Sequence, residues 1–163
     1  MHGQQQLLDE LDEAFVDTEP PALIKPNGHS LEARRAAEFF SGRCWRDVTL
    51  EILRDGYPGD ISACLEFLSA ESGLYFLPAY LRICVVAYGE SDVLPYTLER
   101  QLSESPANVS HFGRVTDRLS TAQRRVVASI LSFLRDHHER DFDVSGAAVA
   151  LGSGWARYLV GHA

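Results

Sequence analysis

The stretch from residue 65 to residue 88 constrains the fold more than any other part of the chain. It reads LEFLSAESGLYFLPAYLRICVVAY and is the most apolar and aromatic segment of the sequence. Apolar side chains recur in it at the helical spacings of three and four, at Leu74, Leu77, Leu81, Val85 and Tyr88. Other apolar residues fill most of the remaining circumference, and a helix that is apolar on most sides is buried on most sides. We therefore predict a central buried helix that begins at Ala70 and is capped by Ser69.

A single proline, Pro78, lies near the middle of this stretch. Proline has no N–H and its ring clashes with the preceding turn, so we expect it to kink the helix or to begin a second one. One interpretation is that the kink shapes a small-ligand pocket, with the candidate residues Trp45, Tyr75, Pro78 and Tyr80. The other is that it only fits the helix to its neighbours, because kinks generally have local packing causes.

The body around this stretch carries helical signals and no alternating run long enough for a sheet. We predict helices over residues 31–40, 48–54, 93–102, 120–134 and 145–160. Asp47 is the predicted cap of the second, and Ser120 with Gln123 forms a capping box at the fourth. A chain of 163 residues suits one domain with a real core. The expected fold is an all-α, single-domain irregular helical bundle around a proline-kinked central hydrophobic helix.

The first 17 residues are predicted to form an acidic amphipathic helix. One side is apolar, with Leu7, Leu8, Leu11, Ala14 and Phe15. An isolated helix of this length is marginal in water, so it must dock on the body or on a partner. Residues 18–30 contain three prolines and a glycine and are predicted to be a connector, and residues 31–163 form the helical body.

The negative charge of the chain is concentrated at its N-terminus. The net charge is −8, and residues 1–19 hold six of the 23 acidic residues but no Lys or Arg, which leaves 17 acids against 15 basic residues elsewhere. Such a segment suits a basic protein partner, and its partner-binding candidates are Asp9, Glu10, Asp12, Glu13 and Asp17. The alternative is a solvated helix face. Nucleic-acid binding is disfavoured because it depends on basic patches.

Several locations and chemistries are also disfavoured. No apolar run is long enough to span a bilayer, and the first residues lack the basic and apolar regions of a signal peptide. The three cysteines, Cys44, Cys64 and Cys84, are far apart and are predicted to be buried thiols rather than disulfides or a CxxC site. These features predict a cytoplasmic protein without a membrane segment.

Motifs for catalysis or cofactor binding are not found. The sequence contains no phosphate-binding glycine loop and no nucleophile elbow. The best metal candidates are His137, His138, Glu139, Asp141 and Asp143, but they lie at a predicted solvated helix end, and zinc needs three or four converging ligands. We therefore predict no catalytic residue, no metal site and no cofactor.

Five segments resemble a bacterial family of helical proteins known as a domain of unknown function. They are E-A-F at residues 13–15, F-x-G-x-x-W at 40–45, F-L-S-A-E-x-x-x-Y-F-L-P-A-Y-L at 67–81, L-S-T-A-Q-R-x-x-V-x-x-x-L-x-F-L at 119–134 and A-L-x-x-x-W at 150–155. The L-P-A-Y-L segment is the most specific of them. The resemblance covers most of the chain and implies a soluble helical bacterial protein. It implies no activity and no catalytic residue.

Three functional hypotheses follow from these observations. The first is a non-catalytic interaction protein, one form of which is an immunity-type inhibitor that covers the active site of a basic toxin. The second is an enzyme or small-ligand sensor with a pocket at the Pro78 kink. The third is a structural subunit of a homo-oligomer. The missing catalytic motifs favour a protein that is not an enzyme.

Overall fold

The regular secondary structure of the chain is helical in the computed structural model, which describes residues 3–91, 93–103, 117–137 and 145–159. The α-helices within these ranges are α1 (Gln4–Ala14), α2 (Leu31–Phe40), α3 (Leu50–Gly56), α4 (Ala70–Val86), α5 (Leu94–Leu102), α7 (Thr121–Asp136) and α8 (Gly146–Ser153). The same ranges contain three short 3-10 helices: η1 (Trp45–Asp47) and η2 (Cys64–Phe67) lie between α-helices, and η3 (Trp155–Tyr158) follows α8. The predicted all-α single-body fold is confirmed.

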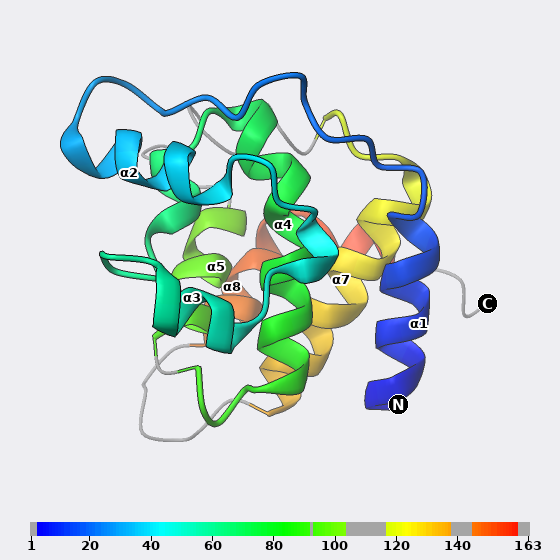
Figure 1. Cartoon of the computed structure of the whole chain (residues 1–163). Helices are drawn as coiled ribbons and strands as arrows, with labels where there is room; N and C mark the ends of the chain where they lie inside the picture. Colours follow the sequence, from blue (N-terminus) through cyan, green and yellow to red (C-terminus); the bar gives the residue numbers. More distant parts are fainter. Residues whose placement is uncertain (1–2, 92, 104–116, 138–144, 160–163) are drawn as a thin grey trace.

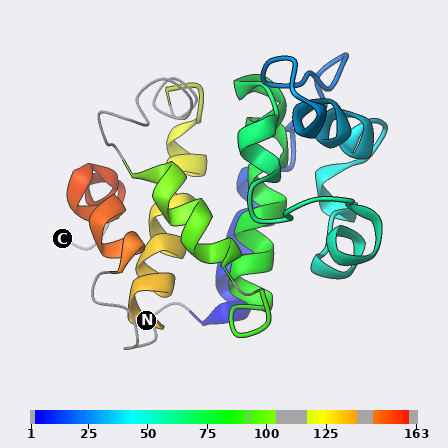
Figure 2. The same ribbon diagram turned by 90° about the vertical axis from the view of Figure 1, so that its left-hand side faces the viewer.

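Helix α4 is the centre of the bundle, as predicted. It begins at Ala70, where the Ser69 side chain accepts a hydrogen bond from the Ser72 N–H at 3.3 Å. Twelve of its 17 residues are buried. Figure 2 shows α4 between two groups of helices, with α5, α7 and α8 on one side and α2 and α3 on the other. A helix covered on so many sides needs apolar residues around its whole circumference, which is the pattern of its sequence.

Pro78 lies inside α4, and the helix continues through it. The proline nitrogen cannot donate to the carbonyl of Leu74, and Pro78 is itself buried. The expectation that a second helix begins at this proline is wrong, because one helix runs from Ala70 to Val86. The kink itself stays a prediction.

Helix α1 packs on the body beside α4 and α7 (Figure 1). Its apolar side is buried, with Leu7, Leu11 and Phe15 each at most 1 % exposed. Gln4 Nε2 also donates to the Val85 carbonyl oxygen at 2.9 Å, which ties the first turn of α1 to the last turn of α4. The helix ends at Ala14, three residues before the predicted end of the acidic segment.

The connector of residues 18–30 is tied to the start of α4. The Ser69 N–H donates to the Lys25 carbonyl at 2.8 Å, and the Lys25 N–H donates to Ser72 Oγ at 2.9 Å. The Asn27 N–H donates to the Phe67 carbonyl at 2.7 Å. These bonds supply partners for backbone groups that a proline-containing segment cannot pair within itself.

Two predicted helix boundaries are wrong for local reasons. Helix α3 is capped by Thr49, whose side chain accepts from the Ile52 N–H, whereas the predicted cap Asp47 lies in η1. The predicted last helix ends at Ser153 because Gly154 adopts a φ of 157°, a conformation that favours glycine. The capping box of Ser120 and Gln123 at α7 is confirmed.

Candidate functional site

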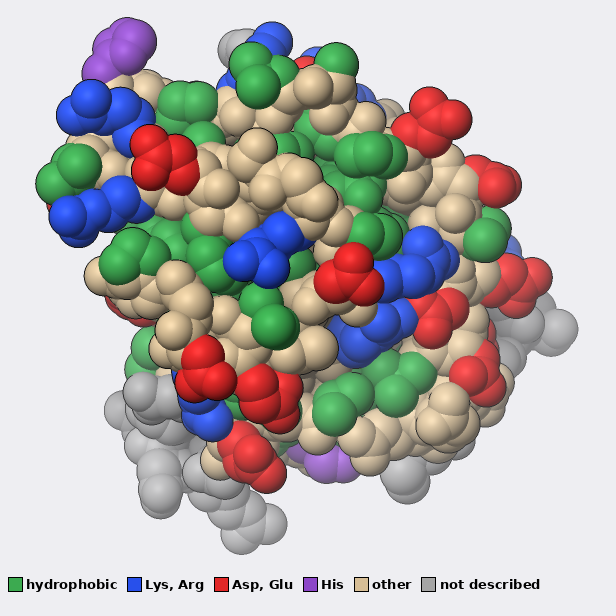
Figure 3. Space-filling model, viewed as in Figure 1, with side chains coloured by type: hydrophobic (Ala, Val, Ile, Leu, Met, Phe, Trp, Pro, Cys, Tyr) green, Lys and Arg blue, Asp and Glu red, His purple; other side chains and the backbone are tan. Residues whose placement is uncertain are grey.

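The outward face of α1 carries the acidic side chains of the N-terminal segment. Leu7 and Leu11 anchor the opposite face, so Asp9 and Glu13, four residues apart, share the solvent side with Asp17 just beyond the helix end. These three are exposed, whereas Glu10 and Asp12 are half-buried. Figure 3 shows acidic side chains along the edge where Figure 1 places α1, with basic side chains beside them.

Two of these carboxylates are aligned by glutamines one turn earlier in the helix. Gln5 Nε2 donates to Asp9 Oδ1, and Gln6 Nε2 donates to Glu10 Oε1, both at 2.9 Å. Side chains four residues apart are neighbours on a helix surface, and such pairs add a few tenths of a kcal/mol, about 0.2–0.5 kcal/mol each. Hydrogen bonds within α1 therefore help to fix the positions of these two acidic side chains.

Asp12 contacts the body of the protein through two arginines. Its carboxylate accepts from Arg82 of α4, and Arg46 Nε of η1 lies 3.8 Å from the same oxygen, Oδ1. Arg46 Nη2 also donates to the Asp12 backbone carbonyl at 3.3 Å. Both guanidinium groups lie over the ring of Trp45, at 4.3 Å for Arg46 and 5.0 Å for Arg82. Asp12 therefore joins α1 to α4 and η1.

A surface hollow opens at the C-terminal end of α1. Its volume is about 430 Å³, and it lies between the end of α1, Leu74 of α4 and the start of α7. The apolar part of its lining consists of Ala14, Phe15, Val16, Leu74 and Leu119, and the polar part of Glu13, Asp17, Thr18, Arg118, Ser120 and Gln123. Two of the five predicted partner-binding acids thus lie at one concave place on the surface.

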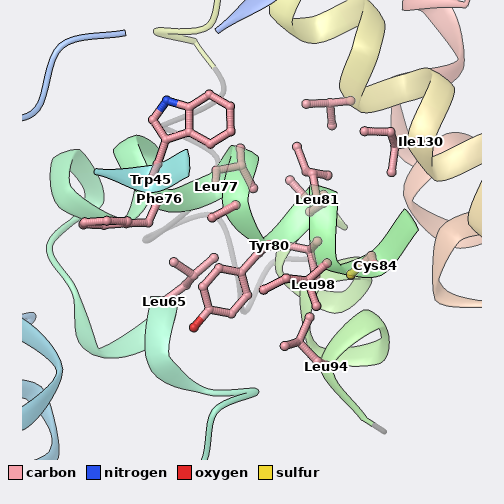
Figure 4. Packing of buried hydrophobic residues seen from close by; sticks show 14 of the residues in the cluster. Trp45, Leu65, Phe76, Leu77, Tyr80, Leu81, Cys84, Leu94, Leu98 and Ile130 are labelled. Atoms are coloured by element: carbon pink, nitrogen blue, oxygen red, sulfur yellow. The ribbon is translucent and has the colours of Figure 1, made fainter. Parts of the chain in front are cut away.

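The four residues predicted to form a ligand pocket at Pro78 are all buried. Trp45 is 0 % exposed, Tyr75 4 % and Tyr80 1 %. Figure 4 shows Trp45 and Tyr80 packed among Phe76, Leu77 and other core side chains. None of the four lines the hollow at the end of α1. The small-ligand pocket at Pro78 stays a prediction.

The polar groups near Tyr80 are held in their neutral forms. The Tyr80 hydroxyl donates to the Ile61 carbonyl at 3.3 Å, and Cys64 is a neighbouring buried thiol. Burial raises the pKa of Cys64 to about 12, and burial likewise raises the pKa of Tyr80. A nucleophilic cysteine needs a lowered pKa, so Cys64 has the character of an inert core thiol. The predicted burial is confirmed for Cys64 and Cys84 but is wrong for Cys44, which is half-buried.

Metal-binding candidates are only partly within the described residues. Of the predicted set, His138, Glu139, Asp141 and Asp143 lie outside them. His137 is exposed at the end of α7, with its Nδ1 atom 2.8 Å from the Phe133 carbonyl oxygen. Within the described ranges, no group of three or more metal-ligating side chains converges. In the same ranges, no helix has the length and apolar character needed to cross a bilayer.

Comparisons of the chain with protein-family models, with curated proteins and with solved structures found no match. The resemblance to the bacterial helical family therefore stays a prediction, and the site has to be interpreted from its own geometry.

The sequence prediction missed both arginine partners of Asp12 and the hollow. Arg82 was a detectable signal, because an arginine inside a largely apolar helix needs a partner for its charge. The hollow had no such signal, since its lining comes from three segments that are far apart in the chain.

Proposed function

We propose that this chain is a non-catalytic, cytoplasmic interaction protein that binds a basic protein partner through the exposed acidic face of α1. An immunity-type inhibitor that covers the active site of a basic toxin is the form of this function that we favour. The observation that carries the proposal is the position of α1: it is docked by Leu7, Leu11 and Phe15, while Asp9, Glu13 and Asp17 face solvent.

A docked helix supports binding better than a free acidic tail. A free segment would lose conformational entropy when it binds, whereas a helix already held by core contacts has lost it during folding. The exposed carboxylates then attract a basic surface, which raises the association rate and makes binding sensitive to salt. Asp12 contributes indirectly in this proposal, because its ion pairs with Arg46 and Arg82 hold the helix in place.

The test is capture of a partner from the organism that encodes the chain, followed by binding measurements with the purified partner. The variant Asp9→Asn/Glu13→Gln/Asp17→Asn removes the three exposed charges while it keeps the size of each side chain. We expect the variant to bind at least about tenfold more weakly at low salt, with a smaller difference above about 0.5 M salt, where the Debye length falls to a few ångströms.

A matched control removes three exposed acids from other elements. The variant Glu38→Gln/Asp55→Asn/Glu90→Gln makes the same change in net charge, and none of its residues lies on α1. We expect it to bind the partner almost as tightly as the wild-type chain. Equal weakening by both variants would attribute the effect to net charge alone and contradict the role of α1. A captured partner with an acidic surface would contradict the proposal as a whole.

A further inference from the structure

The hollow at the end of α1 combines exposed acids with an apolar floor. Glu13 and Asp17 are both exposed and both line it. Neither carboxylate forms an ion pair with another described residue. Phe15 and Leu119 in the same lining are buried, and Leu74 and Ala14 are half-buried. Val16 at this hollow is 59 % exposed, among the most exposed large apolar side chains of the described chain.

The backbone adds negative potential at the same place. The C-terminal end of a helix carries a partial negative charge, and a basic residue in the last turn normally complements it. The last turn of α1 contains no basic residue and instead contains Glu13. The chain then turns through hydrogen bonds from the Val16 N–H to the Glu13 carbonyl and from the Thr18 N–H to the Phe15 carbonyl, which keep Asp17 next to the helix end. Two carboxylates and the helix end therefore favour a cation here.

Among the lining residues that the structure describes, Arg118 is the one basic side chain. Together with Glu13 and Asp17, it gives these described lining residues a formal charge of one negative unit, which a guest with one positive charge would balance. Hydrogen-bonding groups of Thr18 and Gln123 complete the polar side, and Gln123 Nε2 donates to Thr18 Oγ1 at 3.4 Å.

We propose that this hollow is the anchor pocket for an arginine side chain of the basic partner. An arginine matches both parts of the lining, because its aliphatic stem packs on apolar surface while its guanidinium pairs with carboxylates in bidentate fashion. Arginine is also enriched among the residues that dominate protein interfaces. The inference rests on the proposed function, and it adds the position of the anchor and the chemical identity of the guest.

The test uses N-acetyl-arginine N-methylamide as the probe and the full chain labelled with ¹⁵N. We expect saturable amide shifts at Thr18, Leu119 and Gln123, with a dissociation constant of about 1–10 mM, because exposed ion pairs are weak and a single side chain buries little apolar surface. The citrulline analogue has nearly the same shape and no charge, so it should produce shifts at least about fivefold smaller at the same concentration.

Two substitutions in the lining should change the affinity for the arginine probe in opposite directions. Glu13→Gln/Asp17→Asn should weaken binding of the arginine probe by about fivefold or more, while Arg118→Gln should tighten it by about twofold because it removes a like charge. Glu38→Gln/Asp55→Asn, which changes exposed acids outside the hollow, should leave binding unchanged. All of these positions except Asp17 and Arg118 lie on helices, and all are exposed, so folding should be preserved.

Several outcomes would overturn the inference. If the citrulline probe bound as tightly as the arginine probe, the hollow would recognise apolar surface and not charge. If Arg118→Gln bound the arginine probe more weakly than the wild-type chain, the hollow would be a site for an anion. Amide shifts spread evenly over all acidic surfaces, or no amide shift, would contradict the presence of a binding pocket. Partner capture that depends on Glu13 and Asp17 without any probe binding would refute the arginine pocket alone. Probe binding without a basic partner would refute the proposed function alone.

Discussion

Helices α4 and α1 contact each other, yet they serve the molecule in different ways. In α4, 12 of 17 residues are buried, and the helix contacts α1, α5, α7, η1 and η2. In α1, Leu7 and Leu11 are the buried residues of an 11-residue helix, Leu8 and Ala14 are half-buried, and its other side chains are polar. The two helices meet through the Arg82–Asp12 ion pair and the Gln4–Val85 hydrogen bond.

This difference in burial separates residues that stabilise the fold from residues that can contact a partner without a loss of stability. A side chain surrounded by core atoms cannot change without a cavity or a clash. A side chain on the outer face of a docked helix can change with little effect on stability. The same comparison predicts where substitutions should alter stability and where they should alter binding.

The largest expected effect is in α4. Phe76 is 0 % exposed and contacts the rings of Phe40 and Tyr75, with centroids 4.5 and 4.8 Å apart. Phe76→Ala should lower the free energy of unfolding by about 3–5 kcal/mol, because it leaves a cavity in the core. Urea denaturation followed by circular dichroism measures this loss. Val86→Ala on the same helix, at a position 56 % exposed, is the control and should change stability by less than about 0.5 kcal/mol.

The next effect is at the docked face of α1. Leu11 is 0 % exposed, and Leu11→Ala should destabilise the protein by about 2–3 kcal/mol. Hydrogen exchange should show faster opening of residues 4–14 than of α4, because α1 covers one side of the bundle only. Gln6→Ala on the exposed face is the matched control. Equal exchange rates in α1 and α4 would contradict the expectation that α1 opens separately from the rest of the bundle.

A smaller effect is expected at Tyr80. Tyr80→Phe removes the hydroxyl that donates to the Ile61 carbonyl and should cost about 0.5–1.5 kcal/mol in the free energy of unfolding. The same variant tests the alternative that α4 shapes a small-ligand pocket at Pro78. That alternative predicts altered ligand affinity with unaltered stability, so a variant that loses stability alone would count against it.

The smallest effect is at the junction between the two helices. Asp12→Asn removes the charge that pairs with Arg46 and Arg82, and it should destabilise the protein by about 0.5–1 kcal/mol, because the Asp12 side chain is 47 % exposed and partly screened by water. The loss should shrink at high salt. Asp9→Asn is the control, since Asp9 is exposed and bonded to Gln5 within α1. Equal losses from both variants would show that the ion pairs do not hold α1.

The sequence predicted most of the fold because the helical signals are local. The Ser69 cap, the Ser120–Gln123 capping box and the apolar stretch from residue 74 to residue 85 each depend on neighbours within a few residues. The errors were local competitions as well. Thr49 displaced Asp47 as a cap because its side chain accepts from the Ile52 N–H, and Gly154 ended the last helix early because glycine readily leaves helical backbone geometry.

The candidate site was predictable only in part. The sequence indicated the acidic face of α1, because the apolar and acidic residues separate by helical periodicity. It did not indicate that Asp12 is paired while Asp9, Glu13 and Asp17 face solvent. Arg46 and Arg82 reach Asp12 from positions 34 and 70 residues away, and nothing in the local sequence selects one acid over its neighbours.

The sequence by itself determined that this chain is all-helical, that its apolar centre is the stretch around Pro78 and that its negative charge lies at the N-terminus. Periodicity, capping and composition carry that information, since each acts over a few residues. Only the tertiary structure decided which acids remain exposed, and only it brought the end of α1, Leu74 and the start of α7 together around one hollow. Those outcomes depend on how distant segments pack, and packing is settled by the shapes of all the side chains at once.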